Sequence, residues 1–249
     1  NEMLERMKRN VEAQQRFVAD AAHQMRTPLT GLKTQAQFAI RENDPEALRH
    51  ALRQIAVGVD RAGRLVNQLL TLARAEGGEA AQQSHEPLDL SVLIREVVED
   101  WVMLALEKRI DLGFEAEGSA MVRGNPFLLC ELAKNLIDNA LRYTPAGGHV
   151  TCRVLNTGVA TVFEVEDNGI GITEAQAEMV FERFYRVDDA STEGSGLGLA
   201  IVQEIAAQHD ASARLRPNPA GRGAIARVVF RIWRPPPPPP PLPDDFSEL

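Results

Sequence analysis

The stretch VADAAHQMRTPLTGLKTQAQFA (residues 18–39) decides the first half of the fold. Its apolar residues recur at alternating steps of four and three, at Val18, Ala22, Met25, Leu29, Leu32, Ala36 and Ala39. A seven-residue repeat of this kind keeps one apolar seam of a helix facing a partner helix. The stretch therefore predicts a long helix that is partnered along one side.

A second long helix is predicted after a break at residues 42–45. Asp44 is a favourable N-cap, and Pro45 suits the first helical position. Gly77-Gly78 is expected to end this helix. The apolar seam repeats within it at Leu48, Leu52, Ile55, Val59, Ala62, Val66 and Leu69.

Two such helices cannot bury their seams by themselves, but a hairpin that pairs with a second hairpin forms a four-helix bundle. We therefore expect a homodimer through residues 15–78. The alternative is a hairpin that packs on its own C-terminal domain.

The pattern changes after a polar linker at residues 79–87. Helices are expected over residues 90–107, 125–143 and 196–208, and strands over 110–115, 150–155, 159–166 and 224–233. Helices gathered against one sheet give an α/β sandwich. The predicted fold class is thus α+β, a two-helix hairpin forming a dimeric four-helix bundle followed by an α/β sandwich. Residues 235–249, which begin with seven prolines, are expected to be a disordered spacer.

The composition excludes several classes of function. The 249 residues carry a formal net charge of -8, which argues against a nucleic-acid partner. The two cysteines, Cys130 and Cys152, form no metal-ligand spacing and no disulfide framework. No run approaches the roughly 20 apolar residues that a membrane-spanning helix requires.

One exposed histidine is a candidate for chemistry. Ala22 and Met25 lie on the helical seam, so His23 and Gln24 should turn toward solvent, with Thr27 one turn along on the same side. An exposed imidazole on a rigid helix is accessible to a large donor molecule. Taken alone, such a residue is far more often an ordinary surface histidine than a reactive one.

Polar residues form a stripe on the helix predicted at residues 125–143. Glu131, Asn135 and Asn139 follow at steps of four, and Arg142 continues their face. Carboxylate and amide oxygens suit Mg²⁺, and an arginine balances phosphate charge. The alternative is a polar surface stripe without a ligand.

The segment Asp167-Asn-Gly169-Ile-Gly171 follows directly after a predicted strand. Its glycines would let the backbone approach a ligand closely, and Asp167 could accept a hydrogen bond from an amino group. Such a turn is by itself weak evidence for a nucleotide site.

A second glycine-rich segment, Gly194-Ser-Gly196-Leu-Gly198, runs into a predicted helix and so offers free backbone N–H groups to an anion. The polar residues 188–193 before it suit a mobile lid. The chain has no Gly-x-x-x-x-Gly-Lys-Ser/Thr loop and no His-Arg-Asp and Asp-Phe-Gly pair, which excludes P-loop and eukaryotic protein kinases.

The order and spacing of these motifs resemble the histidine kinases of two-component systems over residues 1–233. In that family's terms, residues 23–29 look like the phosphoacceptor box, 135–139 like the N box, 167–171 like the first glycine box, 181–184 like the F box and 194–198 like the second glycine box. The resemblance implies the end of a HAMP signalling helix at 1–14, a dimerisation and phosphotransfer domain at 15–78, and an ATP-binding domain of the gyrase, chaperone, kinase and MutL superfamily at 88–234.

The resemblance also implies roles for individual residues. Mg²⁺ would be held by Asn135, to which the polar stripe of the same helix adds Glu131 as a candidate ligand. The phosphates of ATP would meet Asn139 and Arg142. The adenine would lie against Tyr143 and be read by Asp167. The remaining nucleotide contacts are expected at Gly169, Gly171, Gly194, Gly196, Leu197 and Gly198.

The implied activity is autophosphorylation of His23 from Mg-ATP, followed by transfer of the phosphoryl group to an aspartate of a response regulator receiver domain. The implied location is the cytoplasmic portion of an inner-membrane protein, attached to the membrane only through a missing upstream part.

One residue departs from the family pattern. The family usually has Glu or Asp directly after the phosphoacceptor histidine, and this chain has Gln24. A glutamine can orient the imidazole but cannot take its proton, so slow autophosphorylation is expected. Gln24 and Thr27 also match the polar pair with which the family places water against a phosphorylated receiver, which adds a phosphatase activity to the expectation.

Two other functions remain open from the sequence. In the ATP-hydrolysing branch of the superfamily, a glutamate at the position of Glu131 activates water. A signalling scaffold would instead bind nucleotide without using His23.

Overall fold

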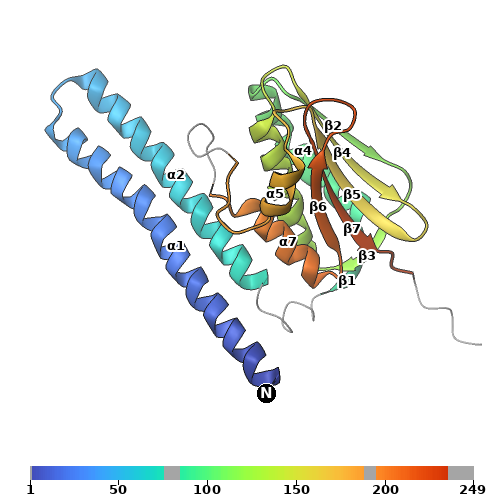
Figure 1. The fold of residues 1–249 in the computed structure, drawn as a ribbon. Helices are drawn as coiled ribbons and strands as arrows, with labels where there is room; N and C mark the ends of the chain where they lie inside the picture. Colours follow the sequence, from blue (N-terminus) through green and yellow to red (C-terminus); the bar gives the residue numbers. More distant parts are fainter. Residues whose placement is uncertain (1, 76–84, 188–194, 235–249) are drawn as a thin grey trace, which may run out of the picture.

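The computed structural model describes residues 2–75, 85–187 and 195–234. The chain begins with an antiparallel hairpin of two long helices, α1 (Glu2–Arg41) and α2 (Pro45–Ala75), and α2 is the one that faces the rest of the protein (Figure 1). Helix α1 runs without a break through Pro28. The predicted helix end at Gly77-Gly78 and the proline-rich tail lie outside the described residues. No helix within the described ranges is long and apolar enough to span a lipid bilayer.

The start of α2 follows the sequence prediction. The Asp44 carboxylate accepts a hydrogen bond from the backbone N–H of Ala47 at 3.0 Å, as an N-cap does. Further along, the two helices approach closely at Gly58, where an added Cβ would lie 2.7 Å from Cδ2 of Leu32. The hairpin therefore packs tightly along one side of the predicted seam.

Part of that seam is not covered by any of the residues that the structure describes. Three of its residues stay more than half exposed, namely Leu29 (52%), Leu52 (53%) and Val59 (54%). Large exposed apolar side chains in a row along a helix pair indicate a surface for association.

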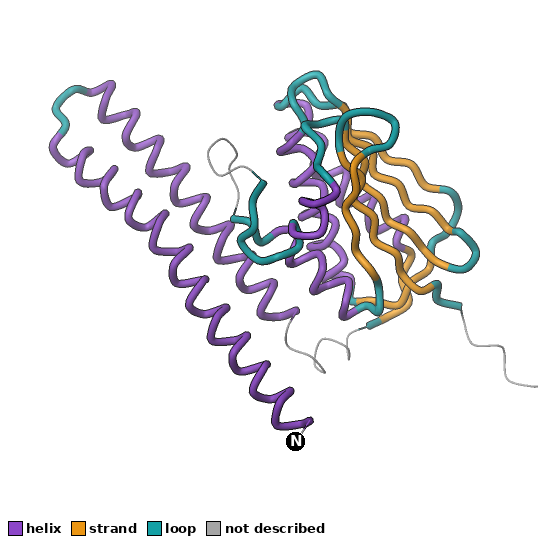
Figure 2. The backbone as a smooth tube through the Cα atoms, viewed as in Figure 1, coloured by secondary structure: helices purple, strands orange, loops and turns teal. Residues whose placement is uncertain are grey.

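The second half of the chain is the predicted sandwich of helices on a sheet, which confirms the fold class. Five strands lie in the order β2-β4-β5-β7-β6, and all neighbours are antiparallel except β2 and β4. Helices α4, α5 and α7 cover one face of this sheet (Figures 1 and 2). The strands of the sheet are β2 (Asp111–Ala116), β4 (His149–Asn156), β5 (Ala160–Asp167), β6 (Ser212–Pro217) and β7 (Ala224–Arg231).

The remaining elements are short or lie around the sheet. A two-stranded antiparallel ribbon pairs β1 (Glu86–Asp89) with β3 (Met121–Gly124). The helices are α4 (Leu90–Glu107), α5 (Pro126–Tyr143), α6 (Glu174–Met179) and α7 (Gly198–Gln208). Helix α5 begins where the sequence predicts, because the Asn125 side chain accepts a hydrogen bond from the backbone N–H of Leu128 at 3.2 Å.

Four elements had no sequence prediction, and one helix begins later than expected. Strands β1 and β3 have four residues each and pair only with one another, so neither shows a readable alternation. The edge strand β6 and the six-residue α6 were also missed. Helix α7 starts at Gly198 rather than at Gly196, because Gly196 has a φ of +72°, which a right-handed helix does not accommodate.

The C-terminal half of α2 shares a hydrophobic core with the sandwich. Leu65, Leu72 and Ala75 are buried in the same cluster as the apolar residues of α4, α5 and α7. The Arg74 guanidinium lies 5.5 Å from the centre of the Phe127 ring at the start of α5. The hairpin thus packs on its own C-terminal domain at one end and leaves Leu29, Leu52 and Val59 of its seam exposed.

Truncation of Leu72 tests this shared core. Leu72 is fully buried, so Leu72→Ala is expected to lower the free energy of unfolding by about 2–5 kcal/mol. Leu70→Ala on the same helix is the control, because Leu70 is 52% exposed and its truncation should cost well under ~1 kcal/mol. Urea unfolding measures both, and equal losses for the two variants would contradict the shared core.

Candidate functional site

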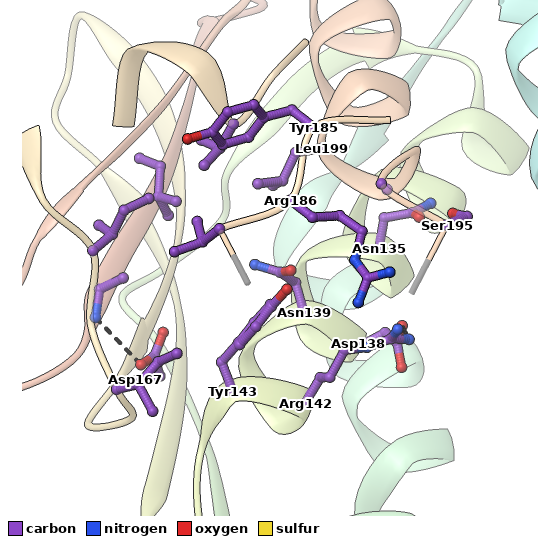
Figure 3. Close-up of a pocket in the computed structure, with 18 of the residues that line it drawn as sticks. Asn135, Asp138, Asn139, Arg142, Tyr143, Asp167, Tyr185, Arg186, Ser195 and Leu199 are labelled. Carbon is purple, nitrogen blue, oxygen red and sulfur yellow. Dashed lines mark hydrogen bonds and ion pairs between the residues drawn. The ribbon is translucent and has the colours of Figure 1, made fainter. Parts of the chain in front are cut away.

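A cavity lies between α5, the turn after β5 and the loop that leads into α7 (Figure 3). Its walls gather residues that are far apart in the sequence. Eight of the predicted nucleotide-contacting residues line it, namely Asn135, Asn139, Arg142, Tyr143, Asp167, Gly171, Gly196 and Gly198.

Helix α5 supplies the polar floor of the cavity. The side-chain amide of Asn135 donates through Nδ2 to the backbone oxygen of Glu131 at 2.7 Å, which leaves its Oδ1 as the acceptor directed at Gly198. Arg142 forms an ion pair with Asp138 one turn earlier, and both residues line the cavity. The α5 side of the cavity therefore carries the amide oxygen of Asn135 and the paired guanidinium and carboxylate of Arg142 and Asp138.

Glu131 does not line the cavity with the others. Its carboxylate accepts a hydrogen bond from Nζ of Lys134 at 3.0 Å, one turn along the helix. Metal binding by Glu131 stays a prediction. No cluster of three or more His, Cys, Asp or Glu side chains suited to a metal occurs among the described residues.

Asp167 ends strand β5 and is 8% exposed. Its Oδ1 accepts hydrogen bonds from the backbone N–H groups of Gly169 (2.9 Å) and Ala224 (3.2 Å). Burial raises the pKa of Asp167, although these two bonds oppose the rise. Because both backbone bonds fall on Oδ1, Oδ2 is the oxygen left to accept a hydrogen bond from a ligand.

The structure explains the glycine at position 169 by a reason that differs from the predicted one. A Cβ at this position would lie 2.3 Å from the backbone oxygen of Tyr143. That oxygen also accepts a hydrogen bond from the N–H of Ile170 at 3.2 Å. The glycine thus lets the turn after β5 sit directly on the end of α5, which sets the distance between Asp167 and Tyr143. Contact of Gly169 with a base stays a prediction.

The loop before α7 forms the opposite wall. The Ser195 hydroxyl accepts a hydrogen bond from the N–H of Leu197 at 3.1 Å and donates to Oε1 of Gln68 on α2 at 2.6 Å. Helix α7 has no side-chain cap at its start, so its first N–H groups are available to an anion. Leu197 is fully buried and packs in the core instead of lining the cavity. Gly194 lies outside the described residues.

Some lining residues had been given no role from the sequence. Tyr185 and Arg186 follow the predicted F box, and Arg186 points across the cavity toward α5 (Figure 3). Asp138 lies within the predicted N box. Gln68 had no signal at all, because its position depends on how the hairpin packs against the second domain.

The predicted phosphoacceptor residue and its two polar neighbours lie on α1, outside the cavity. His23, Gln24 and Thr27 are all exposed on α1, as the helical pattern predicted, and none of them lines the cavity. Helix α2 lies between α1 and the sandwich (Figure 1). The structure thus brings together the predicted nucleotide residues but keeps His23 apart from them.

The sequence matches two family models, the His Kinase A (phospho-acceptor) domain over residues 13–78 and the histidine kinase-, DNA gyrase B- and HSP90-like ATPase over residues 124–236. It is also 41% identical to the sensor protein kinase PmrB of Pseudomonas aeruginosa over 92% of this chain. The chain belongs to the two-component histidine kinases.

Other relatives of this histidine kinase chain agree. The sensor protein QseC of Escherichia coli K12 is 41% identical over 84% of the chain. The crystal structure of full-length ShkA in complex with AMPPNP is 26% identical, with a TM-score of 0.64, and the match covers 89% of this chain and 47% of ShkA. The chain spans about half the length of the curated relatives, 48% of PmrB and 46% of QseC.

The close approach of two loops of this histidine kinase chain gives a steric prediction. Gly196 accepts a hydrogen bond from the N–H of Phe184 at 2.8 Å, and a Cβ on Gly196 would lie 2.6 Å from the Phe184 backbone. Gly196→Ala is therefore expected to cost at least ~1–2 kcal/mol of stability through the left-handed φ alone, and to displace the cavity wall.

Gly63→Ala is the control, because a Cβ there meets no atom within 4 Å and Gly63 lies inside helix α2. It should leave stability unchanged or raise it by up to ~1 kcal/mol. Thermal unfolding of both variants measures the difference, and a neutral Gly196→Ala would refute the steric argument.

Proposed function

We propose that the chain is the phosphoacceptor and ATP-binding part of a sensor histidine kinase. It transfers the γ-phosphoryl group of Mg-ATP to His23 and then to an aspartate of a response regulator receiver domain. The observation that carries the proposal is the cavity, in which an asparagine-rich helix face, a buried aspartate and a glycine loop meet, in one chain with an exposed histidine.

The end of the cavity at Asp167 suits adenine. Asp167 holds one carboxylate oxygen on two backbone N–H groups, so the second can accept a hydrogen bond from the exocyclic amino group. Tyr143 offers an aromatic face at the same end of the cavity (Figure 3).

The other end suits phosphates. Arg142 and Arg186 line it from opposite walls, and the uncapped start of α7 adds backbone N–H groups. Oδ1 of Asn135 fits Mg²⁺, because this ion prefers oxygen ligands and keeps several waters. Bound Mg-ATP supplies the phosphoryl group, and these residues hold its phosphates and offset their charge.

His23 is the proposed nucleophile. A neutral imidazole has one ring nitrogen with a free electron pair, and the exposed face of α1 leaves that nitrogen open to a donor. Because α2 stands between α1 and the cavity, the transfer requires either movement of the ATP-binding domain off α2 or the cavity of a second chain.

A second chain is part of the proposal. The exposed seam residues Leu29, Leu52 and Val59 lie on the hairpin that matches the phosphoacceptor family model. Burying them against the same residues of another copy gives the four-helix bundle of a homodimer through residues 15–78. The parent protein is proposed to lie at the inner membrane with this chain on the cytoplasmic side.

Incubation of the full chain with γ-labelled ATP and Mg²⁺ tests the function. The expected result is protein-bound label that is stable to base and labile to acid, and that His23→Ala abolishes. His50→Ala is the matched control, because His50 is also exposed on the hairpin, and it should keep the label. Free labelled phosphate without labelled protein would instead support the ATP-hydrolysing branch of the superfamily, and bound but unreacted nucleotide would support a scaffold.

The neighbour of His23 sets the expected rate. Gln24 can orient the ring through a hydrogen bond but cannot act as a general base. A general base at this position would accelerate autophosphorylation by at most ~10²–10⁴-fold. Gln24→Glu is therefore expected to speed autophosphorylation in single-turnover measurements, with unchanged ATP affinity. Gln54→Glu, at an exposed position of α2, is the control, and equal rates for Gln24→Glu and the unmodified chain would refute the role.

Gln24 and Thr27 carry a further part of the proposal, a phosphatase activity toward the phosphorylated regulator. Both side chains are exposed one turn apart beside His23, where they can hold a water against a docked receiver domain.

A further inference from the structure

Two histidine rings stack at the point where the chain enters the ATP-binding domain. His85 is the first described residue after the hairpin and directly precedes β1, and His209 follows α7. Their ring centroids are 4.5 Å apart, and the ring planes differ by 15°. The pair thus connects the incoming chain with the helix that begins at the glycine loop.

Both nitrogens of His209 are engaged. Nδ1 lies 2.7 Å from the backbone oxygen of Ile205, and Nε2 lies 3.0 Å from the backbone nitrogen of Asn125. The backbone N–H of Asn125 must donate, so Nε2 accepts and Nδ1 carries the proton. This arrangement exists only for the neutral ring, since a second proton on Nε2 would face the N–H of Asn125.

The bond to Asn125 connects His209 to the start of the helix that carries the site, while the cavity lies toward the other end of that helix. Asn125 is the N-cap of α5, the helix that carries Asn135, Asn139 and Arg142. His209 therefore joins the end of α7 to the start of α5, and both helices form walls of the cavity. The ring is held closely, because a Cβ on Gly124 would lie 2.7 Å from its Cδ2.

The surroundings of the pair disfavour positive charge. His209 is 6% exposed, and burial lowers its pKa to about 4. Nε2 of His85 is buried and has no hydrogen-bond partner among the described residues. The pKa of His85 is lowered by burial and, to a smaller extent, by the nearby Arg123 of β3. Asp210, which follows α7, acts in the opposite direction and raises the pKa of both rings.

We propose that the stacked pair His85–His209 is a proton-sensitive joint, in which His209 is a positioning residue for the nucleotide site. While both rings are neutral, the joint fixes the entry of the chain against the ends of α5 and α7. Uptake of a proton separates the rings, breaks the bond to Asn125 and loosens the cavity. The effect on nucleotide binding rests on the function proposed above.

The direction and size of the response follow from linkage. The pKa of His209 falls from 6.5 to about 4 when the ring is in place, so the displaced ring binds protons more readily between these values. The equilibrium constant that favours the stacked form over the displaced form is therefore unchanged above pH 6.5, and proton uptake by His209 lowers it by up to about tenfold per pH unit between pH 6.5 and about 4. The pKa of His85 is also lowered by burial, so proton uptake by this ring acts in the same direction.

The first test is a histidine titration of the full chain by NMR, which needs no nucleotide. The expected result is that the His85 and His209 rings titrate below the ordinary range and that the protection factor of the Asn125 amide against hydrogen exchange falls as they take up protons. Titration of both rings at ordinary values, or an Asn125 amide that ignores them, would overturn the joint.

The second test compares variants by binding of a fluorescent ATP analogue at pH 7.5 and pH 5.5. His85→Phe keeps a planar ring for stacking but cannot take up a proton, so its loss of affinity on acidification should be smaller than that of the unmodified chain. His50→Phe, on the exposed face of α2, should respond as the unmodified chain does.

Comparison at equal pH cancels the titration of the nucleotide itself. An identical acid response of His85→Phe and the unmodified chain would overturn the proposal. Absence of binding at both pH values would refute the proposed nucleotide function instead, and the NMR titration would still decide whether the joint exists.

Discussion

The burial of one face of helix α5 fixes the geometry on which the site depends. Leu129, Leu132, Leu136 and Ile137 are at most 2% exposed, so the helix cannot rotate without exposing them. With that face buried, Asn135, Asn139 and Arg142 must face the cavity. The two ends of the helix are held as well, by the Asn125 cap with His209 at one end and by the contact of Tyr143 with the turn after β5 at the other. The polar residues of the site are therefore positioned by the core and by the contacts at the two ends of the helix.

Helix α2 of the hairpin contacts this site through its side chains, in addition to the linker that joins the two domains. The Ser195 hydroxyl, in the loop that ends at Gly198, donates to Gln68 of α2, and Leu72 of α2 lies in the core of the ATP-binding domain. Helix α2 thus contributes to a wall of the cavity while it separates His23 from it. In the proposed function, a kinase reaction within one chain would require this contact to open, so the packing of α2 would affect activity as well as stability.

The sequence was most informative where local rules act. The N-caps Asp44 and Asn125, the strongly periodic helices and the hairpin of β4 and β5 all follow from neighbouring residues. Steps of four on a helix overshoot a full turn by roughly 40°, so Glu131 drifts off the face of Asn139 and bonds to Lys134 instead. Gln68, the stacked histidines and the short ribbon of β1 and β3 depend on contacts between distant segments, which no local pattern contains.

In the proposed function, Asp167 is the residue that selects the base, because its free carboxylate oxygen can only accept a hydrogen bond. Adenine offers an amino donor at the position where guanine has a carbonyl oxygen. The most direct measurement is the affinity of the full chain for Mg-ATP and Mg-GTP, with Asp167→Asn and, as a control, Asp111→Asn at an exposed position. The expected result is a preference for ATP, a loss of roughly 10–100-fold in ATP affinity for Asp167→Asn, and no change for Asp111→Asn. Equal affinities for the two nucleotides, or an Asp167→Asn variant that binds ATP as the unmodified chain does, would contradict the account.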